Sequence, residues 1–469
     1  MGGDQEPSSQ NMTLRFFGAT HTVTGSKYLL SIGKRRILVD AGIFQGDKQW
    51  RRRNWDPFPH PPNDITDILI THAHMDHVGY LPVLVKAGFS GTIWATPGTI
   101  RLSEIVLRDA GYLQVMETRA AQRGGYSKHS DPKPLYTPAD VEVTLGMFRS
   151  VDYGSPLELG DGIVATWIRA GHILGSASIH VQTPGSSVLF SGDLGRPHPP
   201  VLKQRSKPPA ADWIVMESTY GDREHIEPDI SHQTMAAAIC GTVERGGHIL
   251  IPAFAIDRTE AVLAVITELI RSKRIPSIPV FVDSPMGLNA LDVYRDLSLE
   301  ELKEDITVDD FLGIPQLTEA RTADDSKRIN TFRHSCIIVS SSGMLEGGRV
   351  LHHLERILPG TEHCIIITGY QAHGTRGRAL IDGARNLKIR GRYIPVRAQV
   401  VQDREFSAHA DASELIDWLS EFSRQPQTVF LTHGEDRARD VFAQRVTTEL
   451  GWNVAVPNYN EIVLLTRPS

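Results

Sequence analysis

The sequence predicts an α/β protein made of two domains, and three observations lead to this prediction. From residue 12 to about residue 222, short strand-like segments punctuated by glycine predominate, with a few helices between them. From about residue 223 to residue 395, helical segments alternate with short apolar segments, which is typical of a parallel sheet flanked by helices. After residue 396 the strand-rich pattern returns, so the second domain is expected to be inserted in the first.

The domain boundaries follow from these changes of pattern. One domain is expected to comprise residues 12–222 and 396–469, and the other residues 223–395. The chain of 469 residues is long enough for each domain to bury a core of its own. Residues 1–11 are polar, and we expect them to form a disordered tail.

In the first domain, the segments "LRFFGA", "KYLLSIG" and "RRILVDAG" predict antiparallel hairpins with a turn at Gly33. Helices are expected over 78–87 and 98–122, with the strand "TIWATP" between them. Further strands are expected in "ELGDGIVATWIRA", "SASIHVQTPGSSVLFSGDLG" and "DWIVMEST". After residue 396, "PQTVFLTHGE" predicts a strand, 436–450 a helix and 462–465 a final strand.

In the second domain, helices are expected from His232, over 257–273 and from Gly347. The apolar strands between and after them are "GHILIPAF", "PVFVDSP", "SCIIVSSS" and "HCIIITG". The helix over 257–273 has apolar residues at helical spacing, and we interpret this stripe as core packing. The stripe consists of Val262, Val265, Ile266, Leu269 and Ile270.

Composition and charge exclude several classes of protein. The formal net charge of -6 provides no global basic field for nucleic acid or membrane lipid, so a polyanion would have to be bound locally. No apolar stretch approaches the roughly 20 residues of a membrane span, and the N-terminal residues lack a signal-peptide pattern. The three cysteines, Cys240, Cys336 and Cys364, form no zinc-ribbon or disulfide pattern and favour a reducing compartment. We therefore expect a cytoplasmic protein without a membrane partner.

Coordinating side chains are concentrated where strands end. The segment "THAHMDH" directly follows the apolar residues 68–70 and supplies His72, His74, Asp76 and His77. Imidazole and carboxylate groups suit zinc and related divalent ions, and a turn that leaves a strand can direct several of them to one place. Three further candidates follow or end apolar segments in the same way, namely His172, Asp193 and His433. The sequence therefore predicts a metal site.

At this point the sequence closely resembles the metallo-β-lactamase fold and, within it, the β-CASP nucleases. That family includes the endonuclease subunit of the eukaryotic cleavage and polyadenylation factor, the RNase J enzymes and many bacterial RNases. The four metallo-β-lactamase motifs correspond to Asp40 in "LVDAG", the segment "THAHMDH", His172 and Asp193. The nuclease branch is marked by Glu217 in "ESTYG", His409 in "FSAHAD" and His433 in "LTHGE". The resemblance implies an αββα sandwich with an inserted α/β β-CASP domain.

The resemblance also implies roles for these residues. One metal ion is expected on His72, His74 and His172. A second is expected on Asp76, His77 and His433, and Asp193 is expected to bridge the two. The ions would be two Zn²⁺, with Mn²⁺ as an alternative, sharing a hydroxide that attacks the phosphate.

The residues expected to act in catalysis are Asp40, Asp76, Glu217 and His409. Asp40 would orient a ligand histidine, and its alternative is a carboxylate that only caps a turn. His409 and Glu217 would together supply the proton that the departing sugar oxygen requires. The alternative for His409 is simple packing at the junction of the two domains.

Substrate contacts are expected in the second domain. The segments "VSSSGMLEGGR" and "GYQAHGTRGR" follow apolar strands, and their Gly, Ser and Thr residues expose groups that can bind phosphates. A tight turn is the alternative reading of such segments. The candidates are Ser341, Ser342, Gly343, Arg349, Thr375 and Arg376, with Arg258 from "PAFAIDR".

The resemblance therefore implies a zinc-dependent ribonuclease that hydrolyses single-stranded RNA in RNA processing or decay. It would be an endonuclease, and 5′-exonucleolytic cutting and a homodimer are further expectations. The alternatives are a DNA-directed β-CASP nuclease and a non-catalytic scaffold subunit of an RNA-processing complex. A small-molecule hydrolase is disfavoured because it would need neither the inserted domain nor His409.

Overall fold

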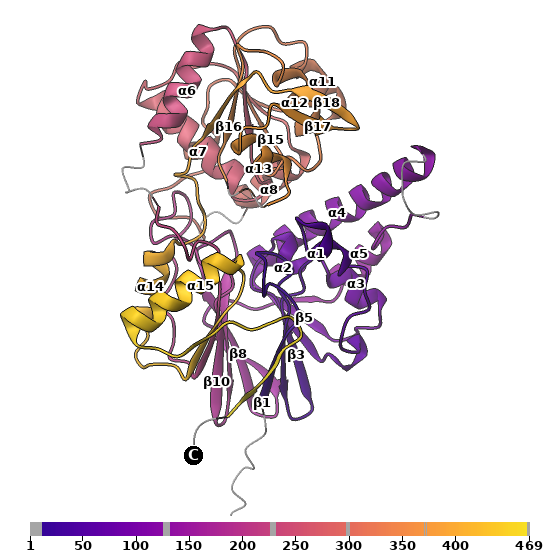
Figure 1. Cartoon of the computed structure of the whole chain (residues 1–469), viewed down its shortest axis with the longest axis vertical. Helices are drawn as coiled ribbons and strands as arrows, with labels where there is room; N and C mark the ends of the chain where they lie inside the picture. The colour runs from indigo at the N-terminus through magenta and orange to yellow at the C-terminus, as the bar shows by residue number, and fades with distance from the viewer. Residues whose placement is uncertain are drawn as a thin grey trace, which may run out of the picture. The chain divides into compact units, whose positions relative to one another are not determined.

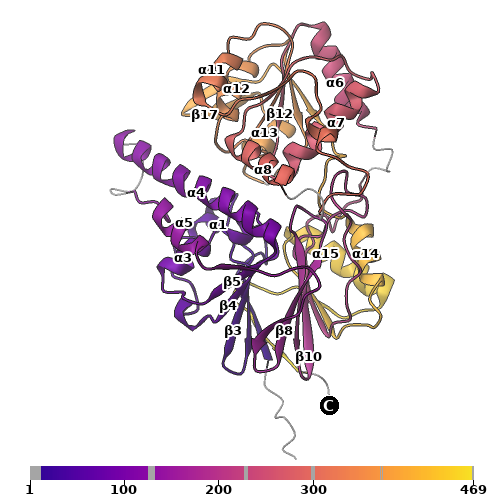
Figure 2. The ribbon, with the colours of Figure 1, turned by 180° about the vertical axis from the view of Figure 1, so that it is seen from behind.

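The fold was obtained as a computed structural model, which describes residues 12–124, 132–225, 231–296, 301–369, 371 and 373–466. The expected disordered tail, residues 1–11, lies outside the described residues. The chain divides into two compact units. Unit 1 comprises Met1–Pro197, Gln204–Glu224 and His409–Ser469, and unit 2 comprises His198–Lys203 and His225–Ala408. Figures 1 and 2 show both units from opposite sides.

Unit 1 contains two seven-stranded sheets, and the first has the order β22-β1-β2-β3-β4-β5-β6. Its strands are β1 (Met12–Phe16), β2 (Tyr28–Ile32), β3 (Arg35–Val39), β4 (Asp67–Leu69), β5 (Thr92–Ala95), β6 (Phe148–Ser150) and β22 (Ile462–Leu465). The expected hairpins are confirmed, because β1 pairs with β2 and β2 with β3 in antiparallel register. From β3 to β6 the pairing is parallel.

The second sheet of unit 1 has the order β21-β20-β11-β10-β9-β8-β7. Its strands are β7 (Leu157–Gly160), β8 (Ile163–Arg169), β9 (Ala177–Thr183), β10 (Ser186–Phe190), β11 (Trp213–Met216), β20 (Thr428–Leu431) and β21 (Val454–Ala455). Strand β20 joins β11 although the larger part of unit 2, His225–Ala408, separates them in the sequence. This pairing closes unit 1 around the insertion.

Helices cover the outer face of each sheet of unit 1 (Figure 1). Those before β7 are α1 (Lys48–Arg52), α2 (Met75–Val78), α3 (Leu81–Lys86), α4 (Pro97–Gly124) and α5 (Pro138–Leu145). Those near the C-terminus are α14 (Ala412–Ser420) and α15 (Asp436–Arg445), which continues as a π-helical turn, η2 (Val446–Leu450). The helices expected over 98–122 and 436–450 are therefore confirmed, whereas α5 and α14 were not predicted.

Two layers of apolar side chains hold unit 1 together. Between the sheets, Leu30 and Phe16 of the first pack with Trp167 and Phe190 of the second. Outside the second sheet, apolar residues of β11 and β20 pack on α14 and α15, including Trp418. Burying side chains of this size contributes about 1.5 to 3 kcal/mol each. This is the expected αββα sandwich.

Unit 2 is built on a six-stranded sheet with the order β14-β13-β15-β12-β16-β19, and every pair in it is parallel. The strands are β12 (Ile249–Pro252), β13 (Val280–Val282), β14 (Leu317–Glu319), β15 (Ile337–Ser340), β16 (Cys364–Ile367) and β19 (Gln399–Gln402). A separate antiparallel hairpin joins β17 (Asn386–Ile389) and β18 (Arg392–Pro395).

Helices lie on both faces of this sheet, as expected (Figures 1 and 2). They are α6 (Gln233–Glu244), α7 (Arg258–Arg271), α8 (Pro285–Asp296), α10 (Asp309–Leu312), α11 (Ala323–Ile329), α12 (Val350–Ile357) and α13 (Arg376–Ile381). The helix predicted over 257–273 is α7, and four of the five residues of its apolar stripe are buried. Its periodicity therefore identified a core-facing helix correctly.

The last passage of the chain from unit 2 to unit 1 lies later than the position that the pattern indicated. The strand-rich style returns at residue 396, but β19 pairs with β16 and completes the sheet of unit 2. The chain enters unit 1 again only at His409. A short polar edge strand has no sequence feature that assigns it to one sheet rather than another. None of the described helices is both long and apolar enough to cross a membrane.

Candidate active site

The segment after β4 carries four of the predicted metal ligands. His72 and His74 lie in the turn between β4 and α2, and His74 is the N-cap residue of α2. Asp76 and His77 lie in the first turn of α2 itself. His72 and His77 are buried, whereas His74 and Asp76 are partly exposed. The abrupt change from strand to helix thus places His72 and His74 before the start of α2, and Asp76 and His77 within it.

The first group of ligand atoms comes from His72, His74, His172 and Asp193, all within 4.8 Å of one another. Nδ1 of His74 lies 3.1 Å from Nε2 of His72 and 3.3 Å from Nε2 of His172. Oδ2 of Asp193 lies 3.5 Å from Nε2 of His72 and 3.6 Å from Nε2 of His172. These residues are the set expected to hold one ion.

The second group comprises Asp76, His77 and His433, again within 4.8 Å. Nε2 of His433 lies 3.3 Å from Oδ2 of Asp76 and 3.2 Å from Nε2 of His77. The other oxygen of Asp193, Oδ1, lies 3.4 Å from Nε2 of His77 and 3.5 Å from Nδ1 of His433. The two oxygens of one carboxylate therefore face one group each.

The chemistry of this cluster fits divalent cations. Oδ1 of Asp193 is buried and, among the described residues, receives no hydrogen bond, although ring nitrogens surround it. Burial lowers the pKa of His74 to about 4, which keeps its imidazole neutral. Burial opposes ionisation of Asp193, but His433 and His77 outweigh it and hold the pKa of that carboxyl well below its usual range. Imidazole nitrogens around an ionised carboxylate suit zinc and similar ions, which take the place of the ring protons when they bind.

Asp40 lies behind the second group. Its Oδ1 accepts a hydrogen bond from the backbone N–H of Thr71 at 2.8 Å, and its Oδ2 lies 2.7 Å from Nδ1 of His77. The hydroxyl of Thr71 donates to Asp40 at 2.8 Å. This leaves Nε2 of His77 directed at the ligand cluster. Thr71 was not singled out from the sequence, and its position directly before "HAHMDH" is the signal that points to it.

Two of the site residues adopt left-handed backbone conformations, with φ of 59° at Asp40 and 48° at His433. This conformation costs a residue with a side chain about 1 to 2 kcal/mol and is concentrated at functional sites. Asp40 directly follows β3 and His433 is the second residue after β20, and these strands belong to different sheets of the sandwich. Thr219, which also escaped the sequence analysis, lies 3.0 Å from Nδ1 of His433 through its hydroxyl.

Glu217 and His409 form a pair beside the cluster. Oε2 of Glu217 lies 3.1 Å from Nδ1 of His409, and Nε2 of His409 lies 4.0 Å from Oδ2 of Asp193. Glu217 also accepts a hydrogen bond from the backbone N–H of Leu194 at 2.5 Å. Burial lowers the pKa of His409, but the charge of Glu217 more than offsets this, so the pKa is raised. The imidazole is therefore able to hold a proton next to the cluster.

The loop after β15 contains three of the expected substrate contacts. Ser341 accepts a hydrogen bond from Ser284 at 2.8 Å, and Ser342 accepts one from a backbone N–H of the same loop at 3.2 Å. A Cβ at Gly343 would lie 2.9 Å from the backbone nitrogen of Phe254, so the close approach of two backbones requires glycine there.

Three other candidates make contacts within unit 2. Arg349 donates to the carboxylate of Asp283 at 2.7 Å and to the carbonyl of Ala320 at 2.8 Å. The hydroxyl of Thr375 caps the start of α13. Arg376 donates to a backbone carbonyl in the loop after β15 at 3.1 Å. These contacts hold the loops of unit 2 in place.

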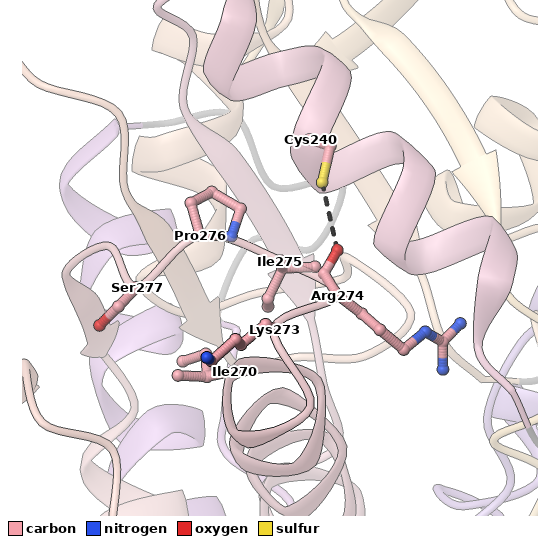
Figure 3. Close-up of a pocket in the computed structure, with 7 residues that line it drawn as sticks. All are labelled: Cys240, Ile270, Lys273, Arg274, Ile275, Pro276 and Ser277. Carbon is pink, nitrogen blue, oxygen red and sulfur yellow. Dashed lines mark hydrogen bonds between the residues drawn. The ribbon is translucent and has the colours of Figure 1, made fainter.

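Arg258 begins α7 and is 8% exposed. Its guanidinium carbon lies 6.0 Å from the ring centre of Phe406, within the range of a cation–π contact. A hollow of about 430 Å³ elsewhere in unit 2 contains none of the predicted site residues (Figure 3). It is lined by Cys240, Ile270, Lys273, Arg274, Ile275, Pro276 and Ser277.

Comparisons with known proteins agree with this geometry. Residues 35–252 match the beta-lactamase superfamily domain, residues 259–380 the Beta-Casp domain and residues 393–457 the Zn-dependent metallo-hydrolase RNA specificity domain. The chain is 37% identical to Ribonuclease TTHA0252 of Thermus thermophilus over 430 residues, which cover 90% of this chain and 92% of that protein. The chain belongs to the β-CASP family of metallo-β-lactamase-fold nucleases. The family inferred from the motifs is thus confirmed.

Other known proteins match over most of the chain. An RNase J-like protein of Methanocaldococcus jannaschii is 30% identical, covering 95% of this chain and 97% of that protein. Transcription termination factor FttA of Methanosarcina mazei is 31% identical, covering 90% of this chain and 66% of the factor. A crystal structure of a protein of unknown function from Enterococcus faecalis matches with a TM-score of 0.54 at 13% identity, over 97% of this chain and all of that one. That last likeness concerns the fold alone.

Proposed function

We propose that this protein is a metal-dependent ribonuclease that hydrolyses phosphodiester bonds of single-stranded RNA. The observation that carries the proposal is the position of Asp193, whose two oxygens each face one group of ligand atoms while His409 lies beside them. A carboxylate shared in this way is typical of sites for two metal ions, which many phosphodiester hydrolases use.

The proposed ligands of one ion are His72, His74 and His172, and those of the other are Asp76, His77 and His433, with Asp193 common to both. Zinc is the proposed metal, and manganese is an alternative. When bound, the pair of ions supplies Lewis acidity for the phosphate oxygens and an activated water molecule as nucleophile. The orphaned buried oxygen of Asp193 supports this assignment.

The protein's own side chains have two further tasks. Asp40 fixes the orientation of His77 by accepting its Nδ1 proton, so that Nε2 is free to coordinate. His409 holds a proton at Nε2 and donates it to the sugar oxygen as the bond between phosphorus and that oxygen breaks. Glu217 keeps the imidazole of His409 protonated and oriented through its contact with Nδ1.

RNA is the proposed substrate for two reasons. Residues 393–457 match the Zn-dependent metallo-hydrolase RNA specificity domain. Two similar proteins are a ribonuclease and an RNase J-like protein. Ser341, Ser342, Gly343 and Arg258 are the proposed phosphate contacts of unit 2. Arg349, Thr375 and Arg376 are also proposed to contribute to substrate binding. Their contacts within unit 2 hold the loops that would contact the phosphates.

A doubly end-labelled RNA and its DNA counterpart, each incubated with protein of measured metal content, test this proposal. Cleavage of the RNA, with loss of activity after chelation, is the expected result, and the labels report whether cutting starts inside or at the 5′ end. Cleavage of DNA alone would establish the DNA-directed alternative. Stoichiometric analysis that finds no bound metal would favour a non-catalytic scaffold.

Three expectations accompany this function. The free cysteines Cys240, Cys336 and Cys364 support a cytoplasmic location, since that compartment keeps thiols reduced. A role in RNA processing or decay and a homodimer stay predictions. Sedimentation analysis of the purified protein tests the homodimer directly.

A further inference from the structure

A patch of aromatic and basic side chains lies on unit 1, outside the residues considered so far. Its members in mutual contact are His21, Trp50, Arg53 and Tyr459, and the exposed residues Arg51, Arg52 and Trp55 are their neighbours in the sequence. The rings of His21 and Trp50 are parallel to within 5°, with centroids 6.3 Å apart. The guanidinium of Arg53 lies 3.8 Å from the ring centre of Tyr459 and 4.7 Å from that of Trp50. These contacts fix the orientation of the three rings and the guanidinium group relative to one another.

The patch is connected to the backbone that carries the proposed metal ligands. Residues 41–44 run beside α2, since Ile43 donates to the carbonyl of Met75 at 3.1 Å. A Cβ at Gly42 would lie 1.5 Å from the carbonyl oxygen of Asp76, so the two backbones touch. On the other side, His433 donates to the carbonyl of Ala19, two residues before His21, at 2.6 Å.

The segment that carries most of the patch is closed at its base. The side chain of Asn54 both donates to and accepts from the backbone of Phe44, each at 2.8 Å. The ring of Phe44 lies 6.2 Å from that of Trp50 at 22°. Residues 45–53, which include the short helix α1, therefore form a loop tethered at its base, which lies against the segment of Asp76 and His77.

Residues 45–53 carry Lys48, Arg51, Arg52 and Arg53 against a single carboxylate, that of Asp47. Arg51 and Arg52 are exposed and form no salt bridge with any described residue. Nη1 of Arg53 is buried and has no hydrogen-bond partner in the described part of the chain. Nearby, the ammonium group of Lys27 donates to the carbonyls of Gly25 and Gly42. The exposed guanidinium groups of Arg51 and Arg52 are available for an anion.

The aromatic part of the patch is also available. Trp55 is 60% exposed, the highest value among the exposed aromatic residues in the described part of unit 1. Exposed tryptophan contributes nothing to a core, whereas aromatic rings beside a basic groove stack on the bases of single strands. Rings with interleaved arginines can bind both the bases and the phosphates of a single strand.

We propose that this patch binds the single-stranded RNA substrate beside the metal centre, with a base stacked on Trp55 and phosphates on Arg51 and Arg52. The inference rests on the proposed ribonuclease function and adds a binding site in unit 1 to the proposed contacts of unit 2. Because the patch recognises rings and phosphates, it confers affinity with little base preference.

The test compares the variants Trp55→Ala and Arg51→Ala/Arg52→Ala with the control variants Tyr112→Ala and Arg119→Ala. Tyr112 is 56% exposed and Arg119 is exposed, and both lie on α4. Cleavage of a single-stranded RNA gives kcat and KM for each full-length, metal-loaded protein. Bis(p-nitrophenyl) phosphate, which is too small to reach the patch and the metal centre together, reports on the metal centre alone.

For Trp55→Ala we expect KM for RNA to rise about tenfold with kcat unchanged, the scale of one lost base stack. In the double arginine variant KM for RNA should rise as well, and the slope of log KM against log salt concentration should fall by about 1.4. Each phosphate contact with a single strand contributes about 0.7 to this slope, and the variant loses two such contacts. The control variants, and all activities with bis(p-nitrophenyl) phosphate, should stay at the wild-type level.

A wild-type KM for RNA in both patch variants would overturn the inference, as would an equal rise in the controls. A matching loss with bis(p-nitrophenyl) phosphate would also overturn it, because the loop would then act through the metal centre. Failure of the unmodified protein to cut any RNA is a different outcome, which would refute the proposed function instead.

Discussion

The carboxylate of Glu217 lies 3.1 Å from Nδ1 of His409, although 192 positions separate the two residues in the sequence. The contact orients the ring, so that Nε2 is directed toward Asp193. His409 is also tied to the backbone, because it forms an isolated bridge with Gly195, two residues after Asp193. Contacts of the ring with Glu217 and of the backbone with Gly195 thus both hold His409 next to the proposed metal ligands.

Replacing His409 with alanine should slow cleavage of RNA by about 10² to 10⁴, the usual contribution of a positioned proton donor. Metal content should stay at the wild-type level, because His409 is not among the proposed ligands. Metal analysis and single-turnover kinetics measure the two quantities. Glu217→Gln, which keeps a hydrogen-bonding group but loses the charge, should be slowed less. An unchanged rate in His409→Ala would remove it from the mechanism.

Replacing Asp193 or His74 with alanine should abolish cleavage and lower the amount of bound metal. Asp193 supplies an oxygen to each ligand group, so its loss should affect both ions, whereas loss of His74 should affect mainly one. Metal stoichiometry after dialysis and RNA cleavage are the measurements. Full activity in a variant with verified metal content would refute the ligand assignment.

Replacing Asp40 with asparagine should weaken metal binding by about 10- to 100-fold, the usual effect of losing a carboxylate behind a ligand histidine. An asparagine can still accept the N–H of Thr71, but its amide would then present N–H groups to Nδ1 of His77. The proton of the ring would move to Nε2, which could no longer coordinate. Competition with a zinc chelator measures the affinity, and wild-type affinity in Asp40→Asn would contradict this role.

Replacing Lys27 with methionine should change how the stability of unit 1 depends on pH. Burial, together with the charge of Arg53, lowers the pKa of Lys27 from 10.5 to about 7. Between these values the unfolded chain binds a proton that the folded chain does not, so the stability of the wild type rises with pH. The difference in free energy of unfolding between the wild type and Lys27→Met should therefore increase by at most about 1.4 kcal/mol per pH unit.

Urea unfolding between these pH values, followed by tryptophan fluorescence, measures this difference. All seven tryptophans lie in unit 1, so the signal reports on that unit alone. Lys86→Met, at an exposed position on α3, is the matched control in which no buried amine is lost. Parallel pH profiles for the wild type and Lys27→Met would show that the folded protein keeps Lys27 charged.

Much of this architecture could be predicted from the sequence because it depends on local patterns. Alternating and glycine-bounded segments predicted the hairpins of β1 to β3, and helical spacing of apolar residues predicted α7. The same local pattern identified His72, His74, Asp76 and His77 as candidate ligands, since they leave one strand within a single turn. Two elements were missed: the edge strand β19, whose short pattern assigns it to neither sheet, and α14, although Asp411 and Glu414 form a capping box at its start.

The sequence by itself determined which side chains follow the ends of strands and which chemistry they offer. Only the tertiary structure decided which of them meet. Nε2 of His433 lies 3.2 Å from that of His77 across 356 positions, because the packing of two sheets brings the ends of β4 and β20 together. The same packing aims the two oxygens of Asp193 at different groups. Spacing along a chain fixes directions within one turn, whereas convergence between distant strands depends on the core that holds them.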